Sequence, residues 1–348
     1  MDRNRRGPYL YDFRLEEVAD WIRKRGAAVV ALQMPEGLKP HGQRIKAELE
    51  KATGATFLLI GDPCYGACDV DSRFPTYADA LVQFGHSEIP AMGQDPRVLF
   101  VEVYFEVDMV PLLERVLPRL KGRVGLITTV QHVRGLDAVR EWLESRGKSA
   151  LIGRGDNRVL FDGQLLGCNI SAAGAVGGEV EQFLYIGSGD FHPLSVAIET
   201  GKEVLVLDPL IGEVRDMGGL KDKILRQRHG AIVRAEKAQR YLVLVSTKVG
   251  QVRMDLALRL KKLLESRGKS ADIVMMERFD PELLMPYQAD AYVSTACPRI
   301  AVDDYLRYQK PILTPVELEI VLGIRDWSDY RMDFITGELD GRSSSIHA

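Results

Sequence analysis

The chain has 348 residues, a mass of 38.9 kDa and a formal net charge of −3, with 46% hydrophobic and 27% charged residues. This composition is ordinary for a globular protein of two or three domains, and the slight negative charge argues against a broad basic surface for nucleic acid. No apolar run approaches the roughly 20 residues of a membrane-spanning helix, and no apolar segment follows the basic start of the chain. We therefore expect a cytoplasmic protein.

The first third of the chain predicts a unit in which helices and strands alternate. The helical spacing of Leu15, Val18 and Ile22 indicates a helix over residues 15–25, and residues 43–52 also predict a helix. Residues 27–33 form a continuous apolar run, which is typical of a strand covered on both faces. Further strands are predicted at residues 57–60, 80–83 and 98–101.

The second third repeats this plan, with a helix predicted over residues 136–146. Asp162 and Gly163 lie between two apolar runs in residues 159–166, and this pair is the strongest signal for a β-hairpin in the chain. A loop of mostly small and polar residues follows at 187–193. Strands are predicted at residues 124–128, 150–152, 183–186 and 204–207.

The last third reveals an internal repeat. Residues 143–150 and 264–271 both have the sequence LESRGKSA, and each octet ends a predicted helix and leads into a predicted strand. A chance match of this length is improbable, so the repeat indicates duplication. Strands of the last third are predicted at residues 242–245, 272–275, 291–293 and 311–313.

The alternation of strands and helices predicts an α/β fold with parallel sheets and right-handed crossovers. We predict three related domains over residues 1–108, 109–215 and 216–336. Each is a roughly four-stranded parallel sheet flanked by helices, and the three are expected in a pseudo-threefold arrangement. Residues 337–348 are expected to form a mobile tail.

Each predicted domain contains a cysteine in a loop beside an apolar run, namely Cys68, Cys168 and Cys297. Loops at the carboxyl ends of parallel strands converge on ligands, so we predict that these thiols meet on one metal centre. Three soft thiolates suit an iron–sulfur cluster, zinc or copper(I), and they leave one metal position open. Cys64 is an alternative first ligand. The spacing also fits thiols that are buried only as small apolar groups.

Other polar residues are predicted at the same edges of the sheets. A loop containing Gly187, Gly189 and Asp190 suits a carboxylate or ribose group, although such residues also form ordinary turns. Gln131 and His192 lie at strand ends that we expect to face the same crevice, and a purely structural role is the alternative for both.

Six segments together resemble the archaeal diphthamide synthase family, also called the 2-(3-amino-3-carboxypropyl)histidine synthases. The sequences Tyr-Gly-Ala-Cys at 65–68 and Ala-Cys-Pro-Arg at 296–299 make the resemblance specific, and it extends over roughly residues 15–331. The six segments are residues 33–38, 62–69, 85–87, 128–133, 189–193 and 295–303.

The resemblance implies a 4Fe-4S cluster bound by Cys68, Cys168 and Cys297, with a non-cysteine tolerated at the position of Cys64. It implies that S-adenosyl-L-methionine binds the open iron, with Gly187, Gly189, Asp190, His192 and Gln131 as the candidate residues around it. A 3-amino-3-carboxypropyl radical then adds to imidazole C2 of a histidine in translation elongation factor 2, the first step of diphthamide biosynthesis.

The resemblance also implies a homodimer that receives electrons from a donor protein or another reductant, without direct contact to nucleic acid or membrane. Two other functions fit a layout of three α/β domains with one cysteine each. One is a quinolinate synthase-like iron–sulfur dehydratase, and the other is a non-catalytic subunit that binds a cluster.

Overall fold

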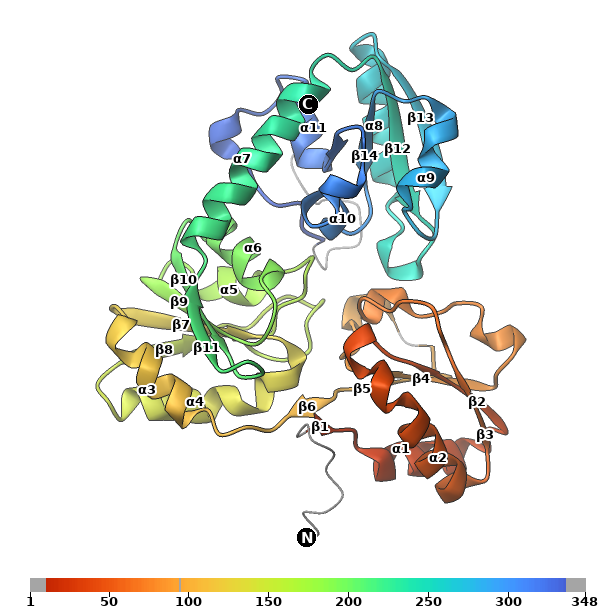
Figure 1. Ribbon diagram of the computed structural model, residues 1–348, viewed down its shortest axis with the longest axis vertical. Helices are drawn as coiled ribbons and strands as arrows, with labels where there is room; N and C mark the ends of the chain where they lie inside the picture. The colour runs from red at the N-terminus through yellow and green to blue at the C-terminus, as the bar shows by residue number, and fades with distance from the viewer. Residues whose placement is uncertain (1–10, 94, 336–348) are drawn as a thin grey trace.

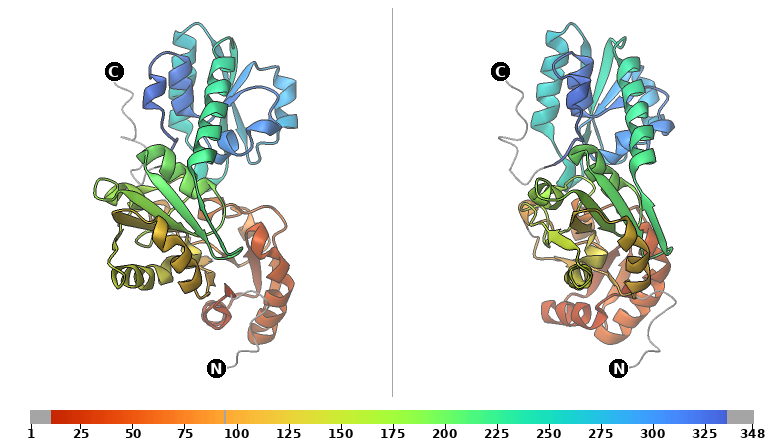
Figure 2. Two further views of the ribbon diagram at one scale, coloured as in Figure 1. Left: turned by 60° about the vertical axis from the view of Figure 1, so that its left-hand side comes forward. Right: turned by 90° about the vertical axis from the view of Figure 1, so that its left-hand side faces the viewer.

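Three α/β units lie at the corners of a triangle in the computed structural model, which describes residues 11–93 and 95–335 (Figure 1). The first and second units lie side by side, and the third lies above them in both further views of Figure 2. The predicted three-sheet α/β fold in a pseudo-threefold arrangement is confirmed. The exact domain bounds stay a prediction, and the expected mobile tail lies outside the described residues.

The first sheet is parallel, with the strand order β3-β2-β4-β5. Val30 and Leu32 face the helices α1 and α2 on one side, whereas Ala31 packs against Phe74 on the other side. Both faces are therefore buried, as the continuous apolar run of β2 predicted. The bounds are α1 Leu15–Arg25, β2 Val29–Gln33, α2 Gly42–Thr53, β3 Thr56–Leu59, β4 Ala80–Phe84 and β5 Val98–Val101.

The second sheet has five strands, in the order β8-β7-β9-β10-β11, which is one more than the roughly four that were predicted. The extra strand β11 (Glu213–Asp216) turns back antiparallel to β10. The Asp208 side chain closes this turn, because it accepts hydrogen bonds from the backbone N–H groups of Leu210 and Ile211. The other bounds are α3 Val110–Val116, β7 Arg123–Thr128, α4 Leu136–Glu144, β8 Ser149–Ile152, α5 Ser171–Val176, β9 Gln182–Ile186, α6 Phe191–Thr200 and β10 Glu203–Asp208.

The hairpin predicted around Asp162 and Gly163 is wrong. The chain does turn there, with Gly163 at φ 72°, but no paired strands flank the turn. The Gln164 side chain accepts hydrogen bonds from the backbone N–H groups of Leu160 and Phe161, which would otherwise be available to a partner strand. Side-chain bonds of this kind compete with sheet ladders, so the segment stays a loop.

The third sheet repeats the order of the first, β13-β12-β14-β15, with all strands parallel. The long helix α7 leads into it from the second unit (Figure 1). The bounds are α7 Gly218–Ala235, β12 Arg240–Ser246, α8 Met254–Ser266, β13 Ser270–Met276, α9 Pro281–Leu284, β14 Ala291–Ser294, α10 Arg299–Val302, β15 Ile312–Leu313 and α11 Pro315–Val321.

One carboxylate recurs at the same place in all three units. Asp79, Glu181 and Asp290 each stand directly before the third strand of their unit. Each accepts a hydrogen bond from the backbone N–H at the start of the neighbouring strand, which is β2, β7 or β12. This shared contact ties the first unit to the repeat that the octets showed for the other two.

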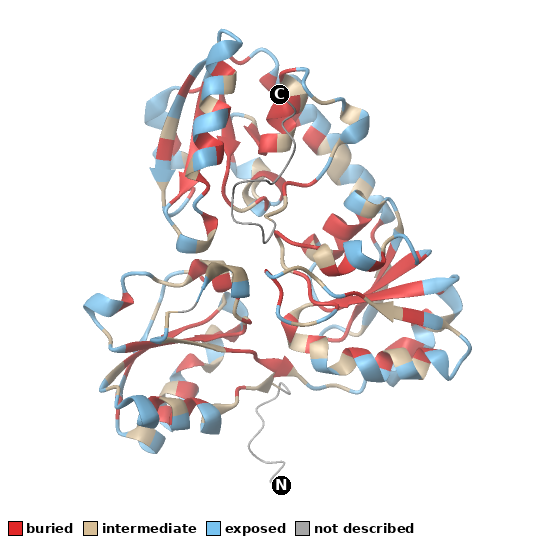
Figure 3. Cartoon of the chain, turned by 180° about the vertical axis from the view of Figure 1, so that it is seen from behind, coloured by how far each residue is buried: buried red, intermediate tan, exposed pale blue. Residues whose placement is uncertain are grey.

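Burial follows this layered plan (Figure 3). The sheets are largely buried and the outward faces of the helices are exposed. A short antiparallel pair, β1 (Tyr11–Asp12) with β6 (Tyr104–Phe105), joins the start of the chain to the connection between the first two units. Within the described residues, no helix is both long and apolar enough to cross a membrane.

Candidate metal centre

The loops that carry three of the four cysteines converge between the units. Cys68 lies in a short 3₁₀ turn after β3, Cys168 in the long loop after β8, and Cys297 between β14 and α10. Burial, and then the neighbouring Cys168, raises the pKa of Cys68 to about 11. Burial, Cys168 and Cys68 together raise the pKa of Cys297. The three thiols are therefore close enough for the charge of one to shift the pKa of another.

The thiols are of the kind that an iron–sulfur cluster takes as ligands. Among the described residues, no three His, Cys, Asp or Glu side chains converge tightly enough to hold one metal ion. All four cysteines are free thiols. A four-iron cluster is larger than an ion, so its cysteine ligands stand farther apart, and iron–sulfur clusters take thiolate ligands.

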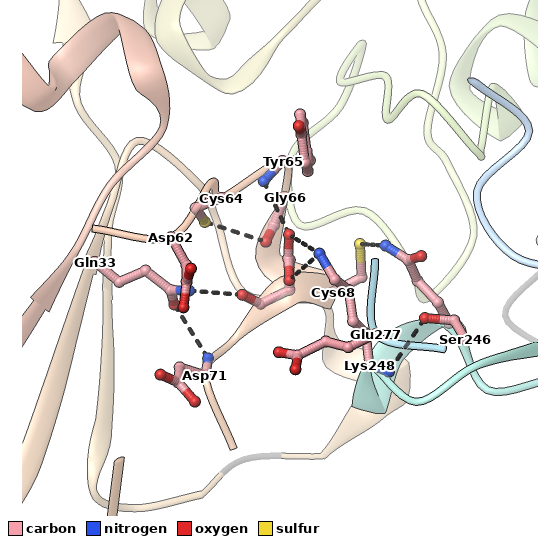
Figure 4. A network of polar contacts seen from close by, with 12 residues as sticks. Gln33, Asp62, Cys64, Tyr65, Gly66, Cys68, Asp71, Ser246, Lys248 and Glu277 are labelled. Carbon is pink, nitrogen blue, oxygen red and sulfur yellow. Dashed lines mark hydrogen bonds and ion pairs between the residues drawn. The ribbon is translucent and has the colours of Figure 1, made fainter. Parts of the chain in front are cut away.

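A loop of the third unit holds Cys68 in place (Figure 4). Gln251 donates from Nε2 to the Cys68 sulfur at 3.4 Å, and Lys248 pairs with Asp69 at 2.8 Å. Gly250 lies so close that a Cβ atom there would stand 2.5 Å from the Cα of Cys68. The first cysteine therefore lies where two units touch.

Cys64 lies among groups of its own unit. Its sulfur is 3.5 Å from Gln83 Nε2 and 4.0 Å from His86 Nδ1, and Figure 4 shows its contact with the carbonyl of Gly66. Burial, and then the charge of Asp69, raises the pKa of Cys64 to about 12. The geometry supports Cys68 over Cys64, and the ligand set stays a prediction.

The end of the described chain supports Cys168. The backbone N–H of Ile335 donates to the Cys168 carbonyl at 2.8 Å, and the Ile335 carbonyl accepts from Asn169 Nδ2 at 3.1 Å. Two residues earlier, Asp333 forms a buried ion pair with Arg253 of the third unit at 2.7 Å. We call residues 332–335 the strap, because they link the third unit to the loop of Cys168.

The residues predicted to surround the co-substrate lie in different surroundings in the structure. Burial, and then the nearby charge of Arg299, lowers the pKa of His192 to about 4, so His192 lies beside that cation. Asp190 accepts two hydrogen bonds from Arg215, at 2.8 and 3.1 Å, so its charge is already paired. Gln131 donates to the carbonyl of Gly85 at 2.8 Å, and it lines a separate cavity over β6.

The two predicted loop glycines allow an unusual backbone path. Gly187 has φ 148° and a Cβ there would stand 2.9 Å from the Tyr185 hydroxyl, while Gly189 has φ 78°. Only glycine adopts such conformations easily, so the sequence of this loop is explained by its shape. The co-substrate roles of these glycines, Asp190, His192 and Gln131 stay predictions.

A cavity of about 650 Å³ opens between the first and third units and reaches Cys297. Its lining includes Tyr65, Lys248, Gln251 and Arg299. Pockets of a few hundred Å³ suit small ligands, so this one has room for a small ligand beside Cys297.

Comparisons with known proteins decide the family. A family model for diphthamide synthesis proteins matches residues 34–332. The chain belongs to this family. It is 37% identical over 333 residues to the 2-(3-amino-3-carboxypropyl)histidine synthase of Pyrococcus horikoshii, covering 94% of this chain and 95% of that protein. It is 30% identical to subunit 1 of the Gallus gallus enzyme, covering 98% and 84%.

Solved structures of the diphthamide synthesis family agree with the fold. The crystal structure of Dph2 from Pyrococcus horikoshii matches with a TM-score of 0.84 at 35% identity, over 94% of both chains. A crystal structure of the same protein with a 4Fe-4S cluster matches to the same extent.

Sequence reasoning missed the residues that support the cysteines, namely Lys248, Gly250 and Gln251. They lie about 180 positions from Cys68, so no spacing rule connects them. The internal repeat offered one signal. Their loop follows β12, the first strand of the third unit. Two of the segments that carry the family resemblance, residues 33–38 and 128–133, begin at the ends of β2 and β7, the corresponding first strands of the other two units.

Proposed function

We propose that this chain is a 4Fe-4S, S-adenosyl-L-methionine-dependent transferase that adds a 3-amino-3-carboxypropyl group to C2 of a histidine imidazole in translation elongation factor 2. The observation that carries this proposal is the meeting of Cys68, Cys168 and Cys297, one from each unit, at one centre. A relative whose enzyme name is this synthase, and a related structure with a 4Fe-4S cluster, support it.

The donor set fits such a cluster. The thiols are soft ligands on loops from three separate sheets, and three ligands leave one iron free for a substrate. When bound, the cluster supplies the single electron that breaks the bond between sulfur and the γ-carbon of S-adenosyl-L-methionine. Overall the transferred group would replace the hydrogen on imidazole C2, with release of methylthioadenosine and a proton and return of the electron, so that the net reaction is redox-neutral.

The chain itself holds and shields the reactants. The cavity that reaches Cys297 would admit the sulfonium co-substrate, and Lys248, Gln251 and Arg299 supply polar and cationic groups along its wall. A carbon radical needs protection from solvent and from other reactive groups. A site enclosed between units meets this need. The homodimer, the electron donor and the cytoplasmic location stay predictions.

The experiment is a reconstitution under anaerobic conditions. Purified protein is loaded with iron and sulfide, reduced with dithionite, and incubated with S-adenosyl-L-methionine and elongation factor 2. We expect methylthioadenosine in solution and one added 3-amino-3-carboxypropyl group on a histidine of the factor by mass spectrometry. The Cys297→Ala variant serves as the negative control. A loaded, reducible cluster that yields neither product contradicts the proposal and favours a non-catalytic subunit or a dehydratase.

A further inference from the structure

Arg158 is a buried cation, and two of its three side-chain nitrogen atoms have no protein partner among the described residues. Its side chain is 6% exposed, and its Nε and Nη2 atoms have no hydrogen-bond partner among the described residues. The contrast with another buried arginine is sharp. Arg228 is fully buried, and its guanidinium bonds Glu317 and the carbonyls of Ala301 and Ile312.

An unpaired buried charge is costly, so an anion is expected next to it in the working protein. The groups around Arg158 identify that anion. Its guanidinium lies near enough to the Cys168 thiol to lower the pKa of Cys168 by its charge, against the larger effect of burial, which raises it. The charge of Arg158 also lowers the pKa of Cys68, against the larger effect of burial. Arg158 therefore lies beside two of the three proposed ligands.

Arg158 lies outside the cavity proposed for the co-substrate. Tyr65, Lys248 and Arg299 line the cavity that reaches Cys297, but Arg158 does not. A molecule that enters through this cavity would meet the other cations first. The unpaired donors of Arg158 are thus placed for the cluster itself, whose thiolates and sulfides are hydrogen-bond acceptors.

We propose that Arg158 is a positioning residue for the cluster, and that its free donors hydrogen-bond sulfur atoms of a cluster held by Cys68 and Cys168 and raise its reduction potential. This inference rests on the cluster of the proposed function. Hydrogen bonds to sulfur and nearby charge are established means of setting such potentials. A cation favours the reduced cluster because reduction adds negative charge.

The first test is a redox titration of loaded protein, followed by EPR without co-substrate. Arg158→Gln removes the cation, and we expect its midpoint potential to fall by the equivalent of at least a tenfold change in the redox equilibrium, about 59 mV for one electron. Arg158→Lys keeps the charge and should shift less. Arg154→Gln is the matched control, because Arg154 is an exposed arginine on the same loop, and it should titrate like the wild type.

The outcomes decide between roles. A fully loaded Arg158→Gln protein with the wild-type potential overturns the inference, as does an equal shift in Arg154→Gln. If Arg158→Gln loses the cluster, retention by Arg158→Lys supports the inference and loss in both contradicts it. A wild-type chain that binds no iron contradicts the proposed function instead, before any variant is compared.

A second test uses protein without a cluster, in urea. Since Arg158 has unpaired donors in the empty site, Arg158→Gln should be at least as stable as the wild type. Arg253→Gln, which breaks the buried pair with Asp333, should unfold at lower urea. Equal destabilisation by both substitutions would show that Arg158 has only a structural role.

Discussion

At the scale of single residues, the two cysteines of the first unit have different surroundings four positions apart. Cys68 contacts the third unit, and the charge of Cys168 raises its pKa. The hydrogen-bond partners of Cys64 belong to its own unit. We expect Cys68→Ala to lose most of its iron and Cys64→Ala to retain a wild-type amount, measured as iron and sulfide per chain after anaerobic loading. Loss of the cluster in Cys64→Ala alone would make Cys64 the ligand.

Gly250 makes the second prediction at this scale. A methyl group there would clash with the backbone of Cys68 at 2.5 Å, and backbone cannot move aside as a side-chain tip can. We expect Gly250→Ala to push the two units apart, to cost on the order of 1–3 kcal/mol as overpacking does, and to reduce iron loading severalfold. Gly178→Ala is the control, because a Cβ atom there meets open space. Equal loading by both variants would contradict the expected close contact.

The same residues show how far sequence reaches into a site. The cysteines could be singled out as candidates because thiols are scarce and each lies in a loop beside an apolar run. Arg158, Lys248 and Gln251 could not, because their roles arise from contacts between separate units or within an irregular loop, and arginine, lysine and glutamine are ordinary on any surface. Their importance depends on burial and proximity, which spacing does not encode.

At the scale of elements, the repeated octet shows one sequence producing one structure twice. In both copies the glycine is left-handed, with Gly147 at φ 76° and Gly268 at φ 71°. The N–H of the following lysine donates to the carbonyl of the first leucine of the octet at 3.0 Å, which closes the helix end. Local signals of this kind were predictable, as were the apolar central strands.

Elements that depend on their neighbours were not predictable. Strand β11 has the mixed sequence EVRD, and it exists because the Asp208 turn returns the chain along β10. The Asp162–Gly163 turn lacked its hairpin because Gln164 took the hydrogen bonds of the expected strand. In both cases one side chain changed where the backbone bonds go.

The strap is the element whose contribution is most directly testable. Arg253 and Asp333 are both buried, so Asp333→Asn leaves a buried cation with a weaker partner. Breaking such a pair costs on the order of 3–5 kcal/mol, and we expect the unfolding midpoint in urea to fall accordingly. The loop of Cys168 should also release iron faster to a chelator. Glu265→Gln, in an exposed pair with Lys261, should change stability by only a few tenths of a kcal/mol. Equal midpoints for the two variants would show that the strap does not stabilise the fold.

At the scale of the whole molecule, histidines lie at strand ends in the first two units. Burial lowers the pKa of His86, His132 and His192 to about 4 in each case. Their ordinary pKa is about 6.5, so the unfolded chain binds protons at a pH where the folded chain does not. The stability due to neutral histidine is therefore complete above about pH 6.5 and is lost as the pH falls toward 4.

His132 gives this pH dependence a direct test, because it is buried against Phe105 and its Nδ1 has no partner among the described residues. Between about pH 7 and pH 5 the wild type should lose on the order of 2 kcal/mol more stability than His132→Phe, measured by urea unfolding of cluster-free protein. His229→Gln replaces an exposed histidine and should keep the wild-type slope. If His132→Phe shows the same dependence on pH as the wild type, protonation of this imidazole does not couple to unfolding. Acid would then loosen the three-unit assembly through other groups.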